Sequence, residues 1–158
     1  MSRREPVSFG WEKLARLLDE PNAMDMIRDQ HAETGSHHAD APLDIDWAEK
    51  MRMEEAGRYR VWAARSGDTL AGFIAWHIIP HLNHRSTLFA ITDVHCLAPA
   101  FRDKDRLGLR MWRSCEPALR DLGVKIVMPH DDIERSLLPF FLALGYRPMM
   151  TIFSKVLR

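Results

Sequence analysis

The chain of 158 residues is long enough for one domain with a buried core, and its 46% hydrophobic and 28% charged residues are typical of a globular protein. A formal net charge of zero argues against a general nucleic-acid binder, because such proteins carry a clear basic excess. Two cysteines, Cys96 and Cys115, do not make a disulfide framework or a zinc site. The sequence also lacks a signal peptide and any apolar run long enough to span a membrane, so a cytoplasmic protein is expected.

The acidic and basic residues are unevenly distributed along the chain. Residues 1–57 hold 7 Lys or Arg against 13 Asp or Glu, a charge of −6, and the rest of the chain holds 15 against 9, a charge of +6. An anionic ligand is therefore expected to bind the C-terminal part.

The acidic N-terminal part is expected to be helical. Apolar residues recur at helical spacing in WEKLARLL (11–18), and AMDMIRDQHAE (23–33) is a second candidate helix. A third helix is expected in WAEKMRMEEAG (47–57), with Asp46 as its N-cap and Gly57 as its C-terminal stop.

From Tyr59 the pattern changes to strands. YRVWAA (59–64) and TLAGFIAWHIIP (69–80) flank an SGD turn and predict a hairpin, and TLFAITDVHCLA (87–98) predicts a third strand. Alternation in this third strand puts five side chains on one face, namely Phe89, Ile91, Asp93, His95 and Leu97. The opposite face then holds Leu88, Ala90, Thr92, Val94 and Cys96.

After Pro99 an amphipathic helix is expected up to Gly123, followed by a short strand, VKIVM (124–128). A second helix, LLPFFLALG (137–145), and a final strand, MMTIFSKVL (149–157), complete the order. This order predicts an α+β fold with a mixed, mostly antiparallel central sheet flanked by helices, in a single domain over residues 1–158.

The junction between the third strand and the following helix has the features of an anion site. Pro99 interrupts strand pairing, so backbone N–H and C=O groups there are free for an extended ligand that carries amides. The next helix start offers unpaired N–H groups, with Arg102, Lys104 and Arg106 nearby and Gly108 allowing close approach. An amide-rich arm joined to a pyrophosphate describes coenzyme A. The alternative is a solvated, charged helix start, since an Arg-rich first turn opposes the helix dipole.

The chain resembles the GNAT acetyltransferase superfamily from Tyr59 onward. The run Leu97-Ala98-Pro99-Ala100-Phe101-Arg102 is similar to that family's apolar-x-Pro-x-aromatic-Arg strand end, and PFFLALGYRP is similar to its aromatic-rich turn. The phrases PLDIDWAEKM, PHLNHRST and LGYRPMMTIFSK are similar to a small GNAT group commonly encoded in tailed phages and prophages.

The resemblance implies transfer of an acetyl group from acetyl-coenzyme A to a primary amine of an acceptor, which is a small molecule or a protein. It implies that residues 58–158 form the coenzyme A-binding core, that residues 1–57 lie on the acceptor side, and that a homodimer is possible. A backbone N–H near Leu97 is implied as the donor to the tetrahedral oxyanion. The implied cofactor-binding residues are Cys96, Leu97, Ala98, Arg102, Lys104, Arg106, Leu107, Gly108, Leu109 and Phe141.

Two departures from the family pattern stand out. The turn from Arg102 to Gly108 is one residue longer than the family's, its first glycine is replaced by Arg106, and Asp103 and Asp105 would repel phosphate. Phe141 occupies the position where many members have a tyrosine that protonates the leaving thiolate. Weaker coenzyme A binding and slower turnover are expected, because a thiolate of pKa about 8.5 still leaves without an acid.

Asp93 and His95 are the candidate catalytic residues. Two residues apart and on the same predicted face, each is placed to take a proton from the attacking amine, directly or through water. The alternatives are an acid paired to a neighbouring strand and a strand histidine with its hydrogen bonds satisfied. His77, His81 and His84 span a strand and a loop, and this spacing does not imply a metal site.

Two other function classes remain open. The irregular turn and Phe141 would also fit a coenzyme A-binding module without catalysis that binds a partner protein. The basic C-terminal part would fit a phage enzyme that modifies nucleic acid, although aromatic-basic clusters are few.

Overall fold

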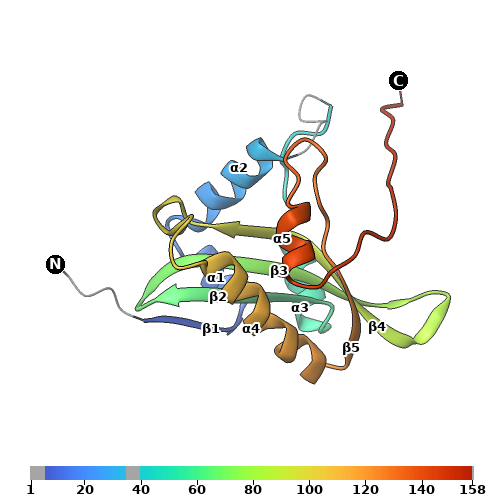
Figure 1. The fold of residues 1–158 in the computed structure, drawn as a ribbon, viewed down its shortest axis with the longest axis horizontal. Helices are drawn as coiled ribbons and strands as arrows, with labels where there is room; N and C mark the ends of the chain where they lie inside the picture. The colour runs from blue at the N-terminus through green and yellow to red at the C-terminus, as the bar shows by residue number, and fades with distance from the viewer. Residues whose placement is uncertain (1–5, 35–39, 158) are drawn as a thin grey trace.

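The computed structural model describes residues 6–34 and 40–157, which form one five-stranded sheet with helices on both faces (Figure 1). The strands lie in the order of the sequence: β1 (Val7–Glu12), β2 (Tyr59–Ser66), β3 (Thr69–His81), β4 (His84–Leu97) and β5 (Val124–Met128). The first three pairings are antiparallel and the pairing of β4 with β5 is parallel. The predicted mixed, mostly antiparallel sheet of an α+β fold is confirmed.

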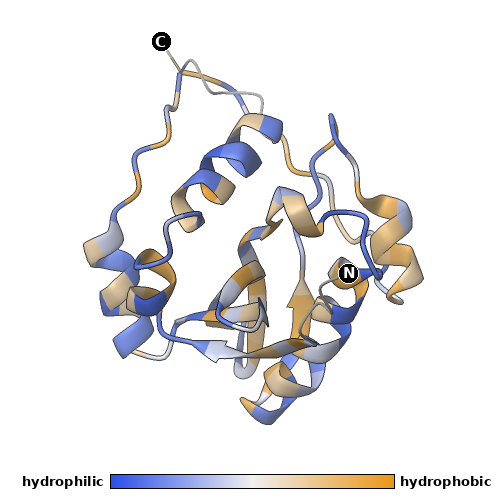
Figure 2. Cartoon of the chain, turned by 90° about the vertical axis from the view of Figure 1, so that its left-hand side faces the viewer, coloured by the Kyte–Doolittle hydropathy of each residue, from blue (hydrophilic) through white to orange (hydrophobic). Residues whose placement is uncertain are grey.

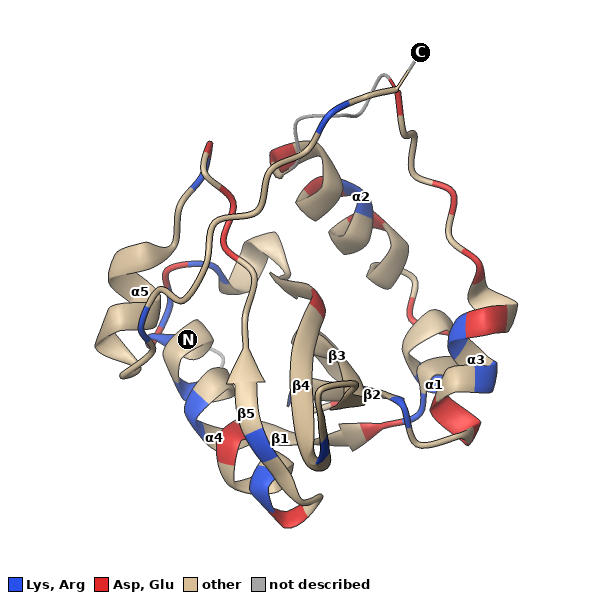
Figure 3. Ribbon diagram, turned by 90° about the vertical axis from the view of Figure 1, so that its right-hand side faces the viewer, with Lys and Arg blue, Asp and Glu red and all other residues tan. Residues whose placement is uncertain are grey.

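The helices divide between the two faces of the sheet (Figure 3). α1 (Leu14–Leu18), α2 (Ala23–Glu33) and α3 (Trp47–Glu55) lie on one face, and α4 (Leu107–Asp121) and α5 (Leu138–Ala143) on the other. A short 3-10 helix, η1 (Pro99–Phe101), follows β4. The flanking helices mix hydrophobic and hydrophilic residues (Figure 2), as expected for elements that cover a sheet. None of the described helices is long and apolar enough to cross a membrane.

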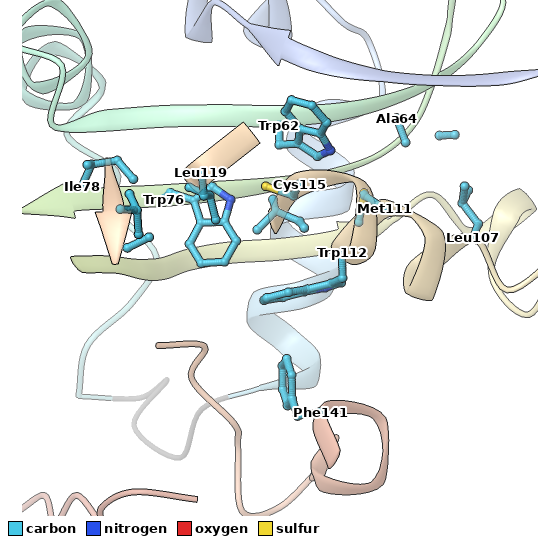
Figure 4. Close-up of a cluster of buried hydrophobic side chains, with 14 residues drawn as sticks. Trp62, Ala64, Trp76, Ile78, Leu107, Met111, Trp112, Cys115, Leu119 and Phe141 are labelled. Atoms are coloured by element: carbon cyan, nitrogen blue, oxygen red, sulfur yellow. The ribbon is translucent and has the colours of Figure 1, made fainter. Parts of the chain in front are cut away.

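Two hydrophobic cores result, one on each face of the sheet. The α4 side buries an apolar stripe of that helix, consisting of Leu107, Met111, Trp112, Cys115 and Leu119. Figure 4 shows this cluster, with Trp112 between the sheet and Phe141 of α5. The other core packs α1 and α2 against the opposite face of β2 and β3. The sequence predicted the α4 stripe correctly, because helical periodicity is unbroken there.

Both ends of the chain differ from expectation. The predicted helix over 11–18 begins only at Leu14, because Trp11 belongs to β1 and packs edge-on against Trp62, its partner on β2, with 4.9 Å between ring centroids. Within the described residues, 149–157 lie outside any helix or strand, so the predicted final strand is wrong. Ile152 and Phe153 are exposed there, and a strand signal yields a strand only where a partner edge is paired with it.

β4 contains one extra residue that the alternation pattern did not predict. Val94 is paired with Ala75 and Thr92 with Trp76, so Asp93 is left over as a β-bulge. A bulge shifts the strand's side-chain phase by one residue, so residues on either side of it that alternate in sequence no longer share a face.

The pairing of β4 with β5 ends just before this bulge. The last described pair is Ile91 with Met128, and beyond it the backbone N–H of His130 donates to Oγ1 of Thr92 at 2.8 Å. From Thr92 to Leu97 the β5-side edge of β4 therefore has no strand partner among the described residues.

Gly72 of β3 fixes the position of the free end of β4. A Cβ added at Gly72 would lie 2.5 Å from Cδ2 of Leu97 and 2.8 Å from the carbonyl oxygen of Cys96. The carbonyl oxygen of Cys96 is a backbone atom, so this steric clash can be relieved only if β4 moves.

We predict that Gly72→Ala lowers the free energy of unfolding by about 1–3 kcal/mol, because overpacking displaces β4. The control is Gly10→Ala in β1, where nothing lies within 4 Å of the added Cβ. Urea denaturation of both variants measures the difference, and equal stabilities would contradict the prediction.

Candidate functional site

A cleft of about 570 Å³ opens between the unpaired end of β4, the N-terminus of α4, and helices α2 and α5. It is lined by Gln30, Glu33, Thr34, His95, Cys96, Leu97, Arg102, Asp103, Arg106, Leu107, Gly108, Leu109, Met111, Trp112, Arg135, Leu137 and Phe140. The cleft thus joins segments that are far apart in the sequence, such as Gln30 on α2 and Phe140 on α5, 110 residues later.

Most of the residues predicted to bind a cofactor line this cleft. They are Cys96, Leu97, Arg102, Arg106, Leu107, Gly108 and Leu109, and His95 joins them. Ala98, Lys104 and Phe141 are outside the described lining. Ala98 is buried and its N–H donates to the carbonyl of Ala71 at 2.9 Å, and Lys104 is exposed on the turn.

Phe140 takes the position at the cleft that the sequence assigned to its neighbour Phe141. Phe141 is buried, with its ring centroid 5.2 Å from that of Trp112 and 5.8 Å from that of Tyr146. Consecutive residues of a helix point about 100° apart, so Phe140 faces the cleft and Phe141 packs in the core, and the assignment of Phe141 to the cofactor stays a prediction.

His95 forms part of the inner wall of the cleft on the α4 side. Its ring centroid lies 5.7 Å from that of Trp112 and 6.2 Å from that of Phe141. Burial lowers the pKa of His95 to about 4, with a small opposing effect from Asp131. The imidazole is therefore neutral at pH 7 and can accept a hydrogen bond at one ring nitrogen.

Arg102 is held by the protein itself. Its Nη1 lies 2.7 Å from Oε1 of Glu33 on α2, and its Nε donates to the carbonyl of Leu97 at 3.2 Å. Arg135 pairs with the other oxygen of Glu33 at 2.7 Å. Arg102 therefore joins β4 to α2, and its charge is already shared with a carboxylate.

The turn before α4 has an unusual backbone. Asp103, Asp105 and Arg106 have φ values of 57°, 50° and 51°, in the left-handed region. Aspartate tolerates this region better than most residues, whereas for arginine it costs about 1–2 kcal/mol. Arg106 thus holds a backbone conformation that favours glycine.

This turn directs the start of α4 into the cleft. Leu107, Gly108 and Leu109 all line it. The N–H of Leu107 donates to the carbonyl of Lys104 at 2.9 Å, whereas the N–H groups of Gly108 and Leu109, in the first turn, have no acceptor within their own helix. The arrangement concentrates backbone donors and the positive end of the helix dipole, which is a favourable environment for an anion. Asp103 also lines the cleft, so the site combines donors with one acid.

Asp93 lies on the opposite face of the sheet from His95, which corrects the expectation that the two share a face. Its carboxylate accepts a hydrogen bond from the Tyr59 hydroxyl at 2.7 Å and forms an ion pair with the Lys50 ammonium. Nε2 of His77 lies 3.6 Å from its other oxygen. The bulge at Asp93 is the reason, because it reverses the side-chain phase between the two residues.

These partners set the protonation of Asp93. Burial alone would raise the pKa of Asp93, but hydrogen bonds from His77, Lys50 and Tyr59 and the charge of Lys50 together hold it well below its usual range. Burial, followed by the charge of Asp93, raises the pKa of Tyr59 far above its usual value. Asp93 is therefore ionised, and the Tyr59 hydroxyl stays protonated and donates a hydrogen bond to it.

Several of these residues were not found from the sequence. Glu33 on α2 and the group of Lys50, Tyr59 and His77 come from helices and strands that only the folded chain brings together. His81 and His84, at the tip of the β3–β4 hairpin, stack with 4.9 Å between ring centroids, separate from the cleft lining.

Known structures with the same fold include several acetyltransferases and a transcriptional regulator from Bacillus halodurans, which matches with a TM-score of 0.67 and 14% identity. An aminoglycoside acetyltransferase from an uncultured soil metagenomic sample matches with a TM-score of 0.68 and 12% identity, over 96% of this chain and 97% of that one. Glucosamine-6-phosphate N-acetyltransferase from Arabidopsis thaliana matches with a TM-score of 0.68 and 12% identity, over 98% of this chain and 100% of that one. A predicted acetyltransferase from Clostridium acetobutylicum, solved with acetyl-CoA, matches with a TM-score of 0.65 and 9% identity, over 96% of each chain.

No protein-family profile and no curated protein sequence matches the chain. Because the identities to these structures are low, they show the fold alone: a single-domain α+β fold of the GNAT type.

We predict that Arg106→Gly raises the free energy of unfolding by about 0.5–1 kcal/mol, because glycine adopts the left-handed conformation without the clash of a Cβ. Lys104→Gly is the control, because Lys104 lies in the same exposed turn outside the left-handed region and only gains freedom in the unfolded chain. Thermal unfolding should show a rise for the first variant and a fall for the second. A fall for both would mean that the turn is not strained at Arg106.

Proposed function

We propose that this protein is an N-acetyltransferase that moves an acetyl group from acetyl-coenzyme A to a primary amine. The observation that carries the proposal is the cleft between the free end of β4 and the N-terminus of α4. One wall offers strand-edge backbone groups, the other offers helix N–H groups, and an extended amide-bearing diphosphate needs both. The acetyl-CoA in the Clostridium acetobutylicum structure, which has the same fold, supports this choice of cofactor.

The residues of the cleft fit coenzyme A. We assign the pyrophosphate to the first turn of α4, with Arg106 as the cationic side chain that replaces a glycine. We assign the amides of the pantetheine arm to the edge of β4 between His95 and Leu97, where β5 has diverged. Acetyl-coenzyme A supplies an acyl thioester, which an amine attacks directly.

Asp93 is the proposed base. We assign the acceptor amine to the α3 side of β4, where Asp93 lies, and the thioester to the β4 edge after Thr92, where no strand partner is described. The carboxylate binds the ammonium group and first takes its proton; the neutral nitrogen then attacks the thioester carbonyl, and the C–S bond breaks to release the coenzyme A thiolate. We assign neutral His95, on the cofactor side, to contact with the acyl group rather than to the first proton transfer.

The acceptor is proposed to be a primary alkylamine. The aminoglycoside acetyltransferase with the same fold was solved in complex with sisomicin. The acidic residues 1–57, with a charge of −6, supply α1, α2 and α3 and favour a cationic acceptor on that face.

A coenzyme A-binding module without turnover is the second candidate, and specific contacts favour it. Arg102 is paired with Glu33, Lys50 is paired with Asp93, and Phe141 supplies no proton to a leaving thiolate. This candidate shares the cofactor cleft and differs only in having no acceptor.

We predict that millimolar acetyl-coenzyme A raises the melting temperature and that Arg106→Glu abolishes this shift, because it places a carboxylate against phosphate. Arg113→Glu is the matched control, since Arg113 is exposed on the same helix outside the described cleft lining. Differential scanning fluorimetry measures the shifts. The absence of a shift in the wild-type protein would refute the cofactor assignment for both candidates.

We predict that Asp93→Asn reduces turnover more than tenfold while the dissociation constant for acetyl-coenzyme A stays within twofold, because the amide keeps the shape and loses the base. Thiol release with amine, peptide and nucleotide acceptors identifies the active class in the wild-type protein. Unchanged turnover in the variant would remove Asp93 as the base. Cofactor binding without thiol release for any acceptor would favour the binding module.

A further inference from the structure

The carboxylate of Asp93 lies in a cage that already holds a primary amine. Nζ of Lys50 contacts Oδ2 of Asp93, lies 3.3 Å from the hydroxyl of Tyr59, and sits 4.7 Å from the centroid of the Tyr59 ring. His77 closes another side, with its ring 5.3 Å from that of Tyr59 and its Nε2 3.6 Å from Asp93. The side chains of Lys50 and Asp93 are only 19% and 22% exposed.

These groups match the requirements of an alkylammonium ion. A carboxylate supplies charge and an acceptor, a hydroxyl oxygen supplies a second acceptor, and an aromatic face attracts the cation. Partial burial strengthens each contact relative to open water.

The cage and its occupant come from elements that are held very differently. Tyr59, His77 and Asp93 project from three adjacent strands, β2, β3 and β4, whose register is fixed by the ladders. Lys50 comes from α3, which has no fully buried residue among its nine described positions. The strand ladders thus fix the three cage residues, whereas Lys50 can leave the cage by rotation of its flexible side chain while α3 stays packed on the sheet through Trp47 and Met53.

We propose that Tyr59, His77 and Asp93 form the binding site for the primary ammonium group of the acceptor, and that Lys50 occupies this site until the acceptor displaces it. This inference rests on the proposed function, because the site is assigned to the acceptor of that acetyl transfer. The class of ligand is an unbranched primary alkylammonium ion, the group that the Lys50 side chain itself presents.

The surroundings of the cage agree with this class. The helix that carries Lys50 also carries the acidic residues Glu49, Glu54 and Glu55. Glu55, the exposed one of the three, attracts a cation and repels an anionic acceptor. A quaternary ammonium ion lacks N–H donors, so it cannot satisfy both the carboxylate and the hydroxyl.

The test uses Lys50→Met, which keeps an unbranched stem and removes the ammonium group. The probe is n-butylammonium chloride, with tetramethylammonium chloride at equal ionic strength as the control. We expect n-butylammonium to raise the melting temperature of Lys50→Met and to bind at least tenfold more tightly than to the wild-type protein. Lys50→Arg keeps a cation in the cage and should show no gain.

The double variant Lys50→Met with Asp93→Asn identifies the site. Loss of n-butylammonium binding in the double variant is expected, because the carboxylate is the principal acceptor. Equal binding by the double and single variants, or no binding by Lys50→Met, would overturn the proposal.

A measurement on the wild-type chain covers the case in which Lys50→Met does not fold. Reductive methylation followed by mass spectrometry should label Lys50 less than the exposed Lys125, and n-butylammonium should raise the labelling of Lys50 at least twofold. Labelling of Lys50 that does not respond to the amine contradicts displacement.

These experiments contain no coenzyme A, so their outcome is separate from that of the proposed function. Binding of n-butylammonium without acetyl transfer to any amine would leave the ammonium site and refute the acetyltransferase. Acetyl transfer with no displacement of Lys50 would support the acetyltransferase and refute the ammonium site.

Discussion

The site depends on a single extra residue in β4. The bulge at Asp93 follows directly on the last pair between β4 and β5, so the strand changes its side-chain phase where it also loses its outer neighbour. Asp93 consequently faces α3 and His95 faces α4. A regular strand would put Asp93 and His95 on the same face of the sheet and leave neither of them on the opposite face. The bulge instead gives one short segment access to both faces of the sheet, with the proposed anion cleft on one side and the proposed ammonium cage on the other.

The turn that precedes α4 and borders the cleft has a backbone conformation that its residues disfavour. Three non-glycine residues hold left-handed backbone conformations before α4, and such strain persists only where the surroundings determine the conformation. The buried stripe of α4 supplies that constraint by fixing the helix against the sheet. The ion pairs of Glu33 with Arg102 and Arg135 hold the opposite wall by joining α2 to the segments after β4 and before α5. The cleft is therefore shaped by packing on one side and by charge on the other.

Much of the fold follows from local sequence patterns, and the site follows only in part. The β2–β3 hairpin, α2, α4 and the N-cap Asp46, whose side chain accepts from the N–H of Glu49 at 2.8 Å, were predicted because their signals are local. The bulge could not be predicted from the sequence, because nothing in the run Thr92-Asp93-Val94-His95 marks an extra residue in β4. Glu33 and Lys50 reach the site from 69 and 43 residues away, and no spacing rule connects them to Arg102 and Asp93. The resemblance to a phage and prophage group stays a prediction.

The same contacts that hold Lys50 also determine how well Asp93 serves as a base. Burial favours the neutral acid, and only the donors around the carboxylate keep its pKa low. When Lys50 leaves, one hydrogen bond and one charge are lost, while Tyr59 and His77 remain on the rigid sheet. The pKa of Asp93 must then rise, since the effect of burial is less fully opposed. An acceptor ammonium in the same cage restores the contact and again lowers the pKa of Asp93. In the proposed reaction the carboxylate therefore takes up the proton only as the ammonium charge that holds its pKa low disappears, and the neutral nitrogen attacks afterwards.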